Sequence, residues 1–158
     1  MYNIDELIEA SYNSHFKLLV LIGDNEYKKQ EIINYLENDN WHNYDIEQVV
    51  LDLTNDIPAE KTHLRIGQKI KDWVKTLEKK VIFYNTNILF SPELKQVKPT
   101  QLFSYLMRGN KQGILFLDAR LKEDQAIYST PDKEDFCKMD LNQVVYADIN
   151  NVTIKEDY

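Results

Sequence analysis

Three short runs of almost unbroken apolar residues most constrain the fold of this chain. They are Phe16–Ile22, Val81–Tyr84 and Gly113–Asp118. Apolar runs of this length without alternation are typical of strands that are buried on both faces of a parallel sheet. The residues between the runs show helical spacing, so strands and helices alternate along the chain. This alternation favours a mainly parallel sheet with helices on both faces, because each helix carries the crossover between two parallel strands.

The expected architecture is a single three-layer α/β domain over residues 1–158, with about five mostly parallel strands. The clearest helical period lies at Ile66–Leu77, where Trp73 is expected on the buried face. The expected strands are Phe16–Ile22, Ile46–Leu53, Val81–Tyr84, Gly113–Asp118 and Gln143–Tyr146. The expected helices are Ile4–Ser11, Glu26–Leu36, Ile66–Leu77 and Pro99–Met107.

The charge and cysteine content exclude several classes of protein. The chain has 19 Lys+Arg against 26 Asp+Glu, a net charge of −7, which disfavours direct binding to nucleic acid. Its single cysteine, Cys137, excludes an internal disulfide and favours a reducing compartment, with the cytoplasm as the default. No run approaches the roughly 20 apolar residues that span a bilayer, and the first residues do not resemble a signal peptide. We therefore expect a soluble cytoplasmic protein without a membrane partner.

The loop after the first strand is the first candidate site, because parallel sheets bind ligands beyond the carboxyl ends of their strands. The loop Gly23–Gln30 matches the phosphate-loop pattern G-x-x-x-x-G-K-[ST] at two of its four defining positions. It keeps the first glycine, Gly23, and the lysine, Lys29. It has Lys28 in place of the second glycine and Gln30 in place of the residue that binds Mg²⁺. A solvated strand-to-helix turn is therefore favoured over a working nucleotide loop, and no cofactor is expected, with ATP as the alternative.

The end of the third strand is the second candidate site. A P-loop ATPase needs an acidic residue for Mg²⁺ and a carboxylate that activates water at this position. The sequence here, Tyr84-Asn85-Thr86-Asn87, contains no acid. Tyr84 cannot replace a metal carboxylate, and Asn87 cannot accept a proton as a general base. We expect this strand end to be adjacent in space to the loop at Gly23, with no catalytic residue, no metal site and no ATP hydrolysis.

The other chemically versatile residues favour structural or surface roles. The histidines are scattered without metal-ligand spacing: His15, His42 and His63. Cys137 lacks the histidine partner that a nucleophile needs. Asp118, at the end of the fourth strand, is placed where a nucleotide could be sensed, but aspartate before a turn is common. Arg108 could reach a phosphate or carboxylate of a partner, and solvation is the simpler role.

Two runs of residues carry a family resemblance: Lys17–Gly23 and Ile82–Gln96. The most specific part is Ile88–Gln96, which is similar to a family run Leu-Phe-x-Pro-x-Leu-Lys-Gln directly after an acidic strand end. Downstream, Arg108–Asn110 is similar to the family's Ser-Arg-Asn segment and Tyr128–Pro131 to its Tyr-Ala-x-Pro segment. Together these segments, which cover most of the chain, resemble BrxF, the small P-loop protein of type 3 BREX bacteriophage-exclusion systems.

The resemblance implies a P-loop NTPase-like fold of the ASCE/RecA-AAA type with degenerate Walker A and Walker B motifs. Family nucleotide-binding roles transfer only to Gly23, Lys29 and Asn85, because the other positions of the two motifs differ. The resemblance therefore implies a catalytically inactive accessory protein of a BREX-like defence system that acts through protein–protein contacts. Its expected partners are other proteins of the system, above all the large ATPase, with Leu89–Gln96 and the loop around Arg108 at the interface.

Several alternatives remain open at this stage. One is a weak nucleotide-binding switch in which Lys29 still holds a phosphate. Another is an ATPase that a partner rescues in trans, against which the missing metal carboxylate counts. The segment Gly23–Tyr27 also resembles the opening of the delta subunit of bacterial clamp loaders, an ATPase fold that has lost hydrolysis. A homo-oligomer is left open as well.

Overall fold

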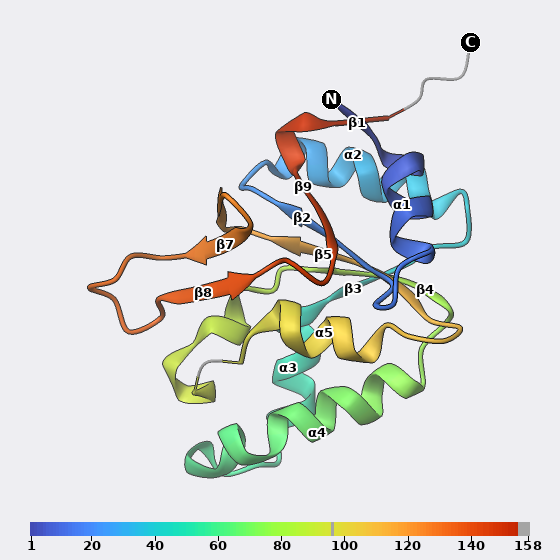
Figure 1. The fold of residues 1–158 in the computed structure, drawn as a ribbon. Coiled ribbons are helices and arrows are strands. Elements are labelled where there is room, and N and C mark those ends of the chain that lie inside the picture. The colour runs from blue at the N-terminus through green and yellow to red at the C-terminus, as the bar shows by residue number, and fades with distance from the viewer. Residues whose placement is uncertain (96, 155–158) are drawn as a thin grey trace.

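A five-stranded parallel sheet forms the centre of the computed structural model, which describes residues 1–95 and 97–154 (Figure 1). The strand order is β3-β4-β5-β2-β9. The strands are β2 (Leu18–Ile22), β3 (His42–Asp45), β4 (Lys80–Tyr84), β5 (Gln112–Leu117) and β9 (Val145–Asp148). Every residue of β2 and β5 is buried, as the apolar runs predicted. The expectation of an α/β fold with a mainly parallel sheet is confirmed.

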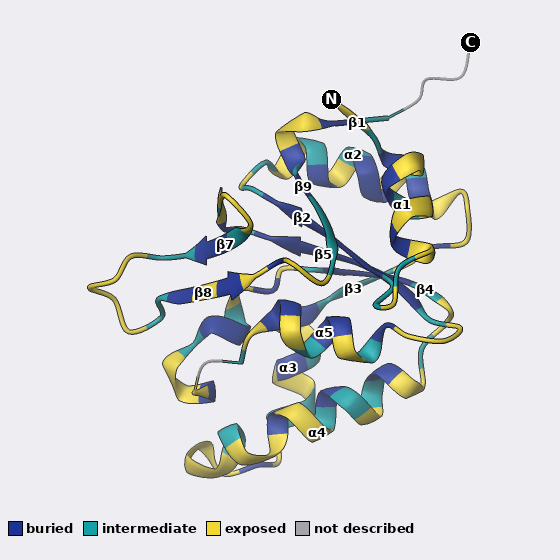
Figure 2. Cartoon of the chain, viewed as in Figure 1, coloured by how far each residue is buried: buried dark blue, intermediate teal, exposed yellow. Residues whose placement is uncertain are grey.

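Helices cover both faces of this sheet (Figure 1). One face packs against α1 (Ile4–Tyr12) and α2 (Glu26–Glu37). The other packs against α3 (Ile46–Thr54), α4 (Thr62–Lys75) and α5 (Pro99–Leu106). Figure 2 shows the central strands buried and the helices exposed on their outer sides. Within the described residues, no helix combines the length and the apolar character needed to cross a membrane.

The expected strand at Ile46–Leu53 is wrong, because these residues form helix α3. The Asp45 side chain caps this helix by accepting a hydrogen bond from the backbone N–H of Gln48 (3.2 Å). The buried residues Ile46 and Val50 lie four apart, so the apolar positions follow the helical period rather than strand alternation. The strand before α3, β3, is a short edge strand of exposed and half-buried residues, which leaves no apolar run in the sequence.

Two small sheets are added to the central one. An antiparallel sheet contains β6 (Arg120–Lys122), β7 (Gln125–Tyr128) and β8 (Cys137–Asp140), and β7 and β8 extend away from the main sheet (Figure 1). A two-residue parallel pair joins β1 (Tyr2–Asn3) to β10 (Val152–Thr153). Single-turn 3-10 helices lie at Ala59–Lys61, Asn87–Phe90, Pro92–Leu94 and Ile149–Asn151. The sequence patterns did not predict these short elements.

Candidate functional site

Polar side chains gather at the carboxyl ends of β2, β4 and β5. We define them as the strand-end cluster: Asp24, Glu26, Lys29, Asn87 and Asp118. The expected direct adjacency of the Gly23 loop and the strand ending at Tyr84 is wrong, because β5 lies between β2 and β4. Asp118, which follows β5, connects the two loops instead. Its Oδ1 accepts a hydrogen bond from Lys29 Nζ at 3.2 Å and its Oδ2 accepts one from Asn87 Nδ2 at 3.2 Å.

Lys29 is the buried cation of this cluster. It lies in the first turn of α2, and its side chain is 7% exposed. Its ammonium also donates a hydrogen bond to Glu26 Oε1 at 2.8 Å. Burial is the largest single influence on the pKa of Lys29 and lowers it, but the hydrogen bonds and charges of Glu26 and Asp118 together outweigh burial and raise it. The lysine that a phosphate loop would offer to a nucleotide is therefore charged and already paired within the chain.

The acidic members of the cluster outnumber this single cation. Carboxylate oxygens of Asp24, Glu26 and Asp118 all lie within 4.8 Å of one another. A phosphate that entered this space would meet a net negative charge, which repels it. Carboxylates can also bind hard cations, but the ammonium of Lys29 already lies among them, paired with one oxygen of Glu26 and one of Asp118. The cluster fits neither a phosphate nor a ready-made cation cage.

Gly23 has a packing reason to be glycine that is independent of nucleotide. Its φ is +135°, a backbone conformation that favours glycine. A Cβ atom at this position would lie 2.8 Å from Ile149 Cγ2, inside contact distance. Its N–H donates to the carbonyl oxygen of Leu117 (2.9 Å), which ties the loop to the end of β5. The first glycine of the phosphate-loop pattern is thus explained by the fold alone.

The N-terminus of α2 is capped from within the chain. Asn25 Oδ1 accepts a hydrogen bond from the backbone N–H of Lys28 (3.0 Å). Asn25 Nδ2 donates to Asn150 Oδ1 (2.7 Å), which anchors the cap to the short helix after β9. Helix N-terminal amides are the groups that bind phosphate in nucleotide loops. Here a side chain accepts the hydrogen bond that a phosphate would otherwise accept from Lys28.

Asn85, the third expected cofactor-binding residue, belongs to a different group of contacts. Its φ is +57°, and its Nδ2 donates to Asp45 Oδ1 (3.1 Å) and Glu47 Oε2 (3.2 Å) at the start of α3. Burial and the charge of Asp45 raise the pKa of the neighbouring Tyr84, which keeps this phenol neutral. The structure therefore places Gly23 and Lys29 near the carboxyl end of β2, while the described contacts of Asn85 are with residues at the start of α3.

The expected interface segment Leu89–Gln96 is partly core. Leu89, Phe90 and Leu94 are buried, and the Phe90 ring stacks on Tyr128 with centroids 3.9 Å apart. Lys95 is exposed, and Gln96 lies outside the described residues. The expectation of surface contact is therefore reduced to the polar positions of this segment.

Three residues that could have carried chemistry lie outside the strand-end cluster: Cys137, Arg108 and His42. The thiol of Cys137 is buried, which raises its pKa despite the opposing charge of Lys98, so it is not an activated nucleophile. Arg108 is exposed, and its guanidinium lies 4.2 Å from the centroid of the Tyr105 ring. His42 faces Glu78 at 3.7 Å on the surface and not the strand-end cluster.

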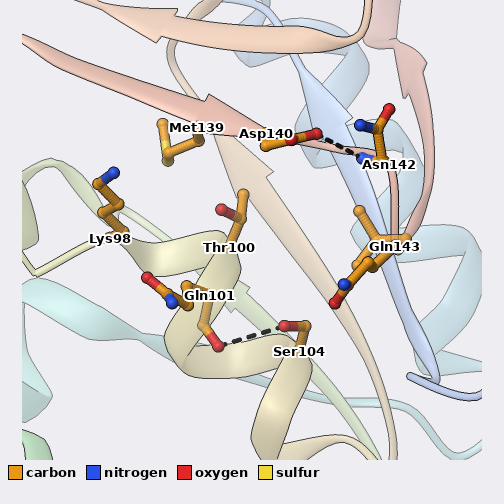
Figure 3. Close-up of a pocket in the computed structure, with 9 residues that line it drawn as sticks. Lys98, Thr100, Gln101, Ser104, Met139, Asp140, Asn142 and Gln143 are labelled. Carbon is orange, nitrogen blue, oxygen red and sulfur yellow. Dashed lines mark hydrogen bonds between the residues drawn. The ribbon is translucent and has the colours of Figure 1, made fainter.

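A separate polar cavity of about 360 Å³ lies between α5 and the loop after β8 (Figure 3). Its floor includes the buried residues Thr100 and Ser104, and the Ser104 hydroxyl donates to the carbonyl oxygen of Gln101 (3.2 Å). Lys98 and Asp140 line it with opposite charges, and Asp140 Oδ1 accepts a hydrogen bond from the backbone N–H of Asn142. The hydrogen bond described for the Ser104 hydroxyl goes to the backbone carbonyl of Gln101, so no described contact pairs it with a base.

Comparison with known proteins adds no family to this description. No protein family, curated protein or solved structure matches the chain. Its function therefore has to be inferred from its own residues and their geometry.

Proposed function

We propose that this chain is a P-loop NTPase-like domain of the ASCE/RecA-AAA type that has lost ATP hydrolysis and acts through protein contacts. Its setting would be a BREX-like bacteriophage-defence system in the cytoplasm, where it serves as an accessory protein. The BrxF-like segments support this setting. The strand order supports the fold type, because one strand, β5, separates the phosphate-loop strand β2 from β4, where the metal carboxylate would follow. That extra strand is the feature that defines the ASCE type.

The internal pairing of Lys29 is the observation that carries the loss of activity. ATP would have to take the ammonium away from Glu26 and Asp118, which are 2.8 and 3.2 Å from it. The released carboxylates would then face the phosphates with like charge. No acid follows β4 to bind Mg²⁺ or to activate water, since Tyr84 to Asn87 contains none. At these positions the chain thus lacks both an unpaired lysine for the phosphates and an acidic residue for Mg²⁺ and water.

ATP turnover tests this loss directly. We expect the purified chain to show no turnover above background with Mg²⁺, and Lys29→Ala to leave that background unchanged. Turnover that disappears in Lys29→Ala would contradict the proposal, because it would show that the lysine still serves a nucleotide. Lys28→Ala is the matched control, since Lys28 is the neighbouring lysine and is paired with Glu31 rather than with Asp118.

A weak nucleotide-binding switch is the second candidate, and one observation favours it. The Glu26 side chain is 74% exposed, so it can move away from Lys29 more easily than Asp118 can. Calorimetric titration with ATP, with and without Mg²⁺, separates the two proposals. Binding that Lys29→Ala abolishes would favour the switch, and no binding at millimolar ATP would favour the inert domain.

The protein partner is tested in cells that carry a whole BREX-like locus. We expect the tagged chain to co-purify with another protein of the locus, first of all its large ATPase. Deletion of the chain should also lower phage resistance. If no protein of the locus is recovered and resistance is unchanged on deletion, the defence role is wrong.

A further inference from the structure

A groove between α4 and α5 collects positive charge on a chain whose net charge is −7. The two helices lie side by side (Figure 1), and two adjoining hollows of about 320 and 440 Å³ share Lys71, Tyr105 and Leu106. We call this surface the α4–α5 groove. All charged side chains that line it are basic: Lys71, Lys75, Lys98, Arg108 and Lys111.

Within the described part of the chain, none of these cations has a carboxylate within ion-pair distance. The ion pairs among the described residues involve Lys28, Lys29, His42 and Lys80, and none belongs to the groove. Lys111 is held beside the turn that follows α4, where its Nζ donates to the carbonyl oxygen of Leu77 at 2.7 Å. Arg108 rests on the Tyr105 ring, which orients the guanidinium without a carboxylate. Tyr44 and, more weakly, the charge of Lys111 lower the pKa of the Glu78 carboxyl, so Lys111 already has a carboxylate nearby. Lys71, Lys75 and Arg108 are the cations left for an outside carboxylate.

The floor of the groove is apolar. Leu102 and Leu106 line it while being only partly buried against the core. Tyr105, which lines both hollows, is 55% exposed. Exposed apolar groups with a charged rim are typical of surfaces that bind other proteins. The apolar floor and the basic rim together favour a ligand that has both apolar and acidic side chains.

We propose that the α4–α5 groove binds an acidic amphipathic segment of a partner protein. The apolar side chains of that segment would contact Leu102, Tyr105 and Leu106, and its carboxylates would pair with the basic rim. A nucleic acid is disfavoured because its phosphates would pair with the basic rim but leave the apolar floor unused. This inference rests on the proposed function only in taking the partner to be a protein.

A synthetic peptide tests the groove without the natural partner. The probe is a helical peptide of about 20 residues with Leu at i, i+3, i+4 and i+7 positions and Glu elsewhere. Titrated into the ¹⁵N-labelled chain, it is expected to shift amide resonances of α4 and α5. The double variant Lys71→Glu/Arg108→Glu should weaken binding by about tenfold or more. The control Lys69→Glu/Lys122→Glu makes the same charge change at lysines that do not line the groove and should bind like the original chain.

Three results would overturn the proposal. They are no resonance shifts at millimolar peptide, equal binding of a peptide with Lys in place of Glu, and tighter binding of duplex DNA through the same residues. Circular dichroism and thermal unfolding of each variant separate lost binding from lost folding. Peptide binding without co-purification of a defence protein would contradict the proposed function and leave the groove inference standing. Co-purification of a defence protein without peptide binding would support the proposed function and contradict the groove inference.

A second readout identifies the natural partner. A photo-crosslinking benzoylphenylalanine placed at position 105, on the groove floor, is used in cells that carry the whole locus. The cross-linked peptide, sequenced by mass spectrometry, is expected to be rich in Asp, Glu and large apolar residues. A basic or uncharged cross-linked segment would overturn the inference.

Discussion

The strand-end cluster and the α4–α5 groove use positive charge in opposite ways. In the cluster, the ammonium of Lys29 is almost fully buried and held by Glu26 and Asp118. In the groove, Lys71 and Arg108 have no carboxylate within ion-pair distance among the described residues. Burial makes an unpaired charge costly, so a buried lysine needs partners from its own chain, whereas an exposed lysine does not.

The two regions also differ in whether their charged groups are free to bind another molecule. The segment Gly23–Gln30 partly matches the phosphate-loop pattern, but its lysine and the N-terminus of its helix already have hydrogen-bond partners within the chain. The groove matches no motif, yet it offers unneutralised charge beside apolar surface. A match to a motif therefore does not by itself assign a function, which has to be argued from the geometry and charges of the site.

The largest loss of stability is expected from Trp73→Ala, because Trp73 packs α4, one of the two helices of the groove, against the sheet. The Trp73 ring lies 5.3 Å from the Tyr44 ring and 6.1 Å from the Phe83 ring, so it joins α4 to the sheet. Because the indole is only partly buried, we expect a loss of about 3 kcal/mol in the free energy of unfolding, at the low end for such a deletion. Urea unfolding measures it, with Trp73→Phe as a milder control. A loss below about 1 kcal/mol would show that this contact does not anchor the helix.

Lys29→Met tests the charge pairing within the strand-end cluster. Removal of this ammonium leaves the carboxylates of Glu26 and Asp118 facing each other without a counter-charge. We expect a loss of about 2 kcal/mol in the free energy of unfolding, and recovery of part of it by adding Asp118→Asn. Lys28→Met is the control and should change stability by less than about 0.5 kcal/mol. Equal losses for the two lysines would show that burial does not matter here.

The pH dependence of this contribution has a definite sign. The pKa of Lys29 is raised above its ordinary value of 10.5, so its stabilising effect is fully present below pH 10.5 and is lost as the pH rises through the raised value. Stability measured by urea unfolding above pH 10.5 should therefore fall more steeply for the original chain than for Lys29→Met. Parallel curves for the two proteins would contradict the pairing.

Gly23→Ala sharpens the comparison by testing whether the loop glycine serves the fold. The added Cβ would clash with Ile149 and would force alanine into a left-handed backbone conformation. We expect a loss of about 2 kcal/mol in the absence of any nucleotide. Gly109→Ala is the control, since Gly109 also has a positive φ (+67°) but no atom within 4 Å of the added Cβ. It should cost about 1 kcal/mol from backbone strain alone. A Gly23 variant no less stable than the Gly109 variant would remove the packing explanation.

The smallest effect on stability is expected from Lys71→Glu/Arg108→Glu. Among the described residues neither cation has a carboxylate within ion-pair distance, and the variant loses only the exposed contact of Arg108 with the Tyr105 ring, so the free energy of unfolding should change by less than about 1 kcal/mol. Thermal unfolding at low and high salt provides the measurement. A loss comparable to that of Lys29→Met would mean that the groove charges support the fold rather than a partner.

The sequence by itself determined the α/β class and the central strands. A strand buried on both faces needs continuous apolar residues, so β2 and β5 are visible as runs. The amphipathic spacing of Ile66, Ile70 and Val74 likewise marked α4. Local signals were weaker where few residues are buried, as at β3 and the small strands β6 to β8. Ile46 and Val50 have helical spacing, but the apolar run Val49–Leu51 between the same bounds also favours a strand, and the sequence alone does not choose between them.

Only the tertiary structure decided the strand order and the partners of the charged side chains. β5 lies between β2 and β4 because of packing across the whole sheet, and this places Asp118 between Lys29 and Asn87. Asp118 is 89 positions from Lys29 in the chain, so no local pattern links them. The α4–α5 groove has the same origin, since Lys71 and Arg108 come together only when α4 and α5 pack on one face. Local periodicity reports burial, whereas the neutralisation of a charge depends on residues that the fold alone brings near.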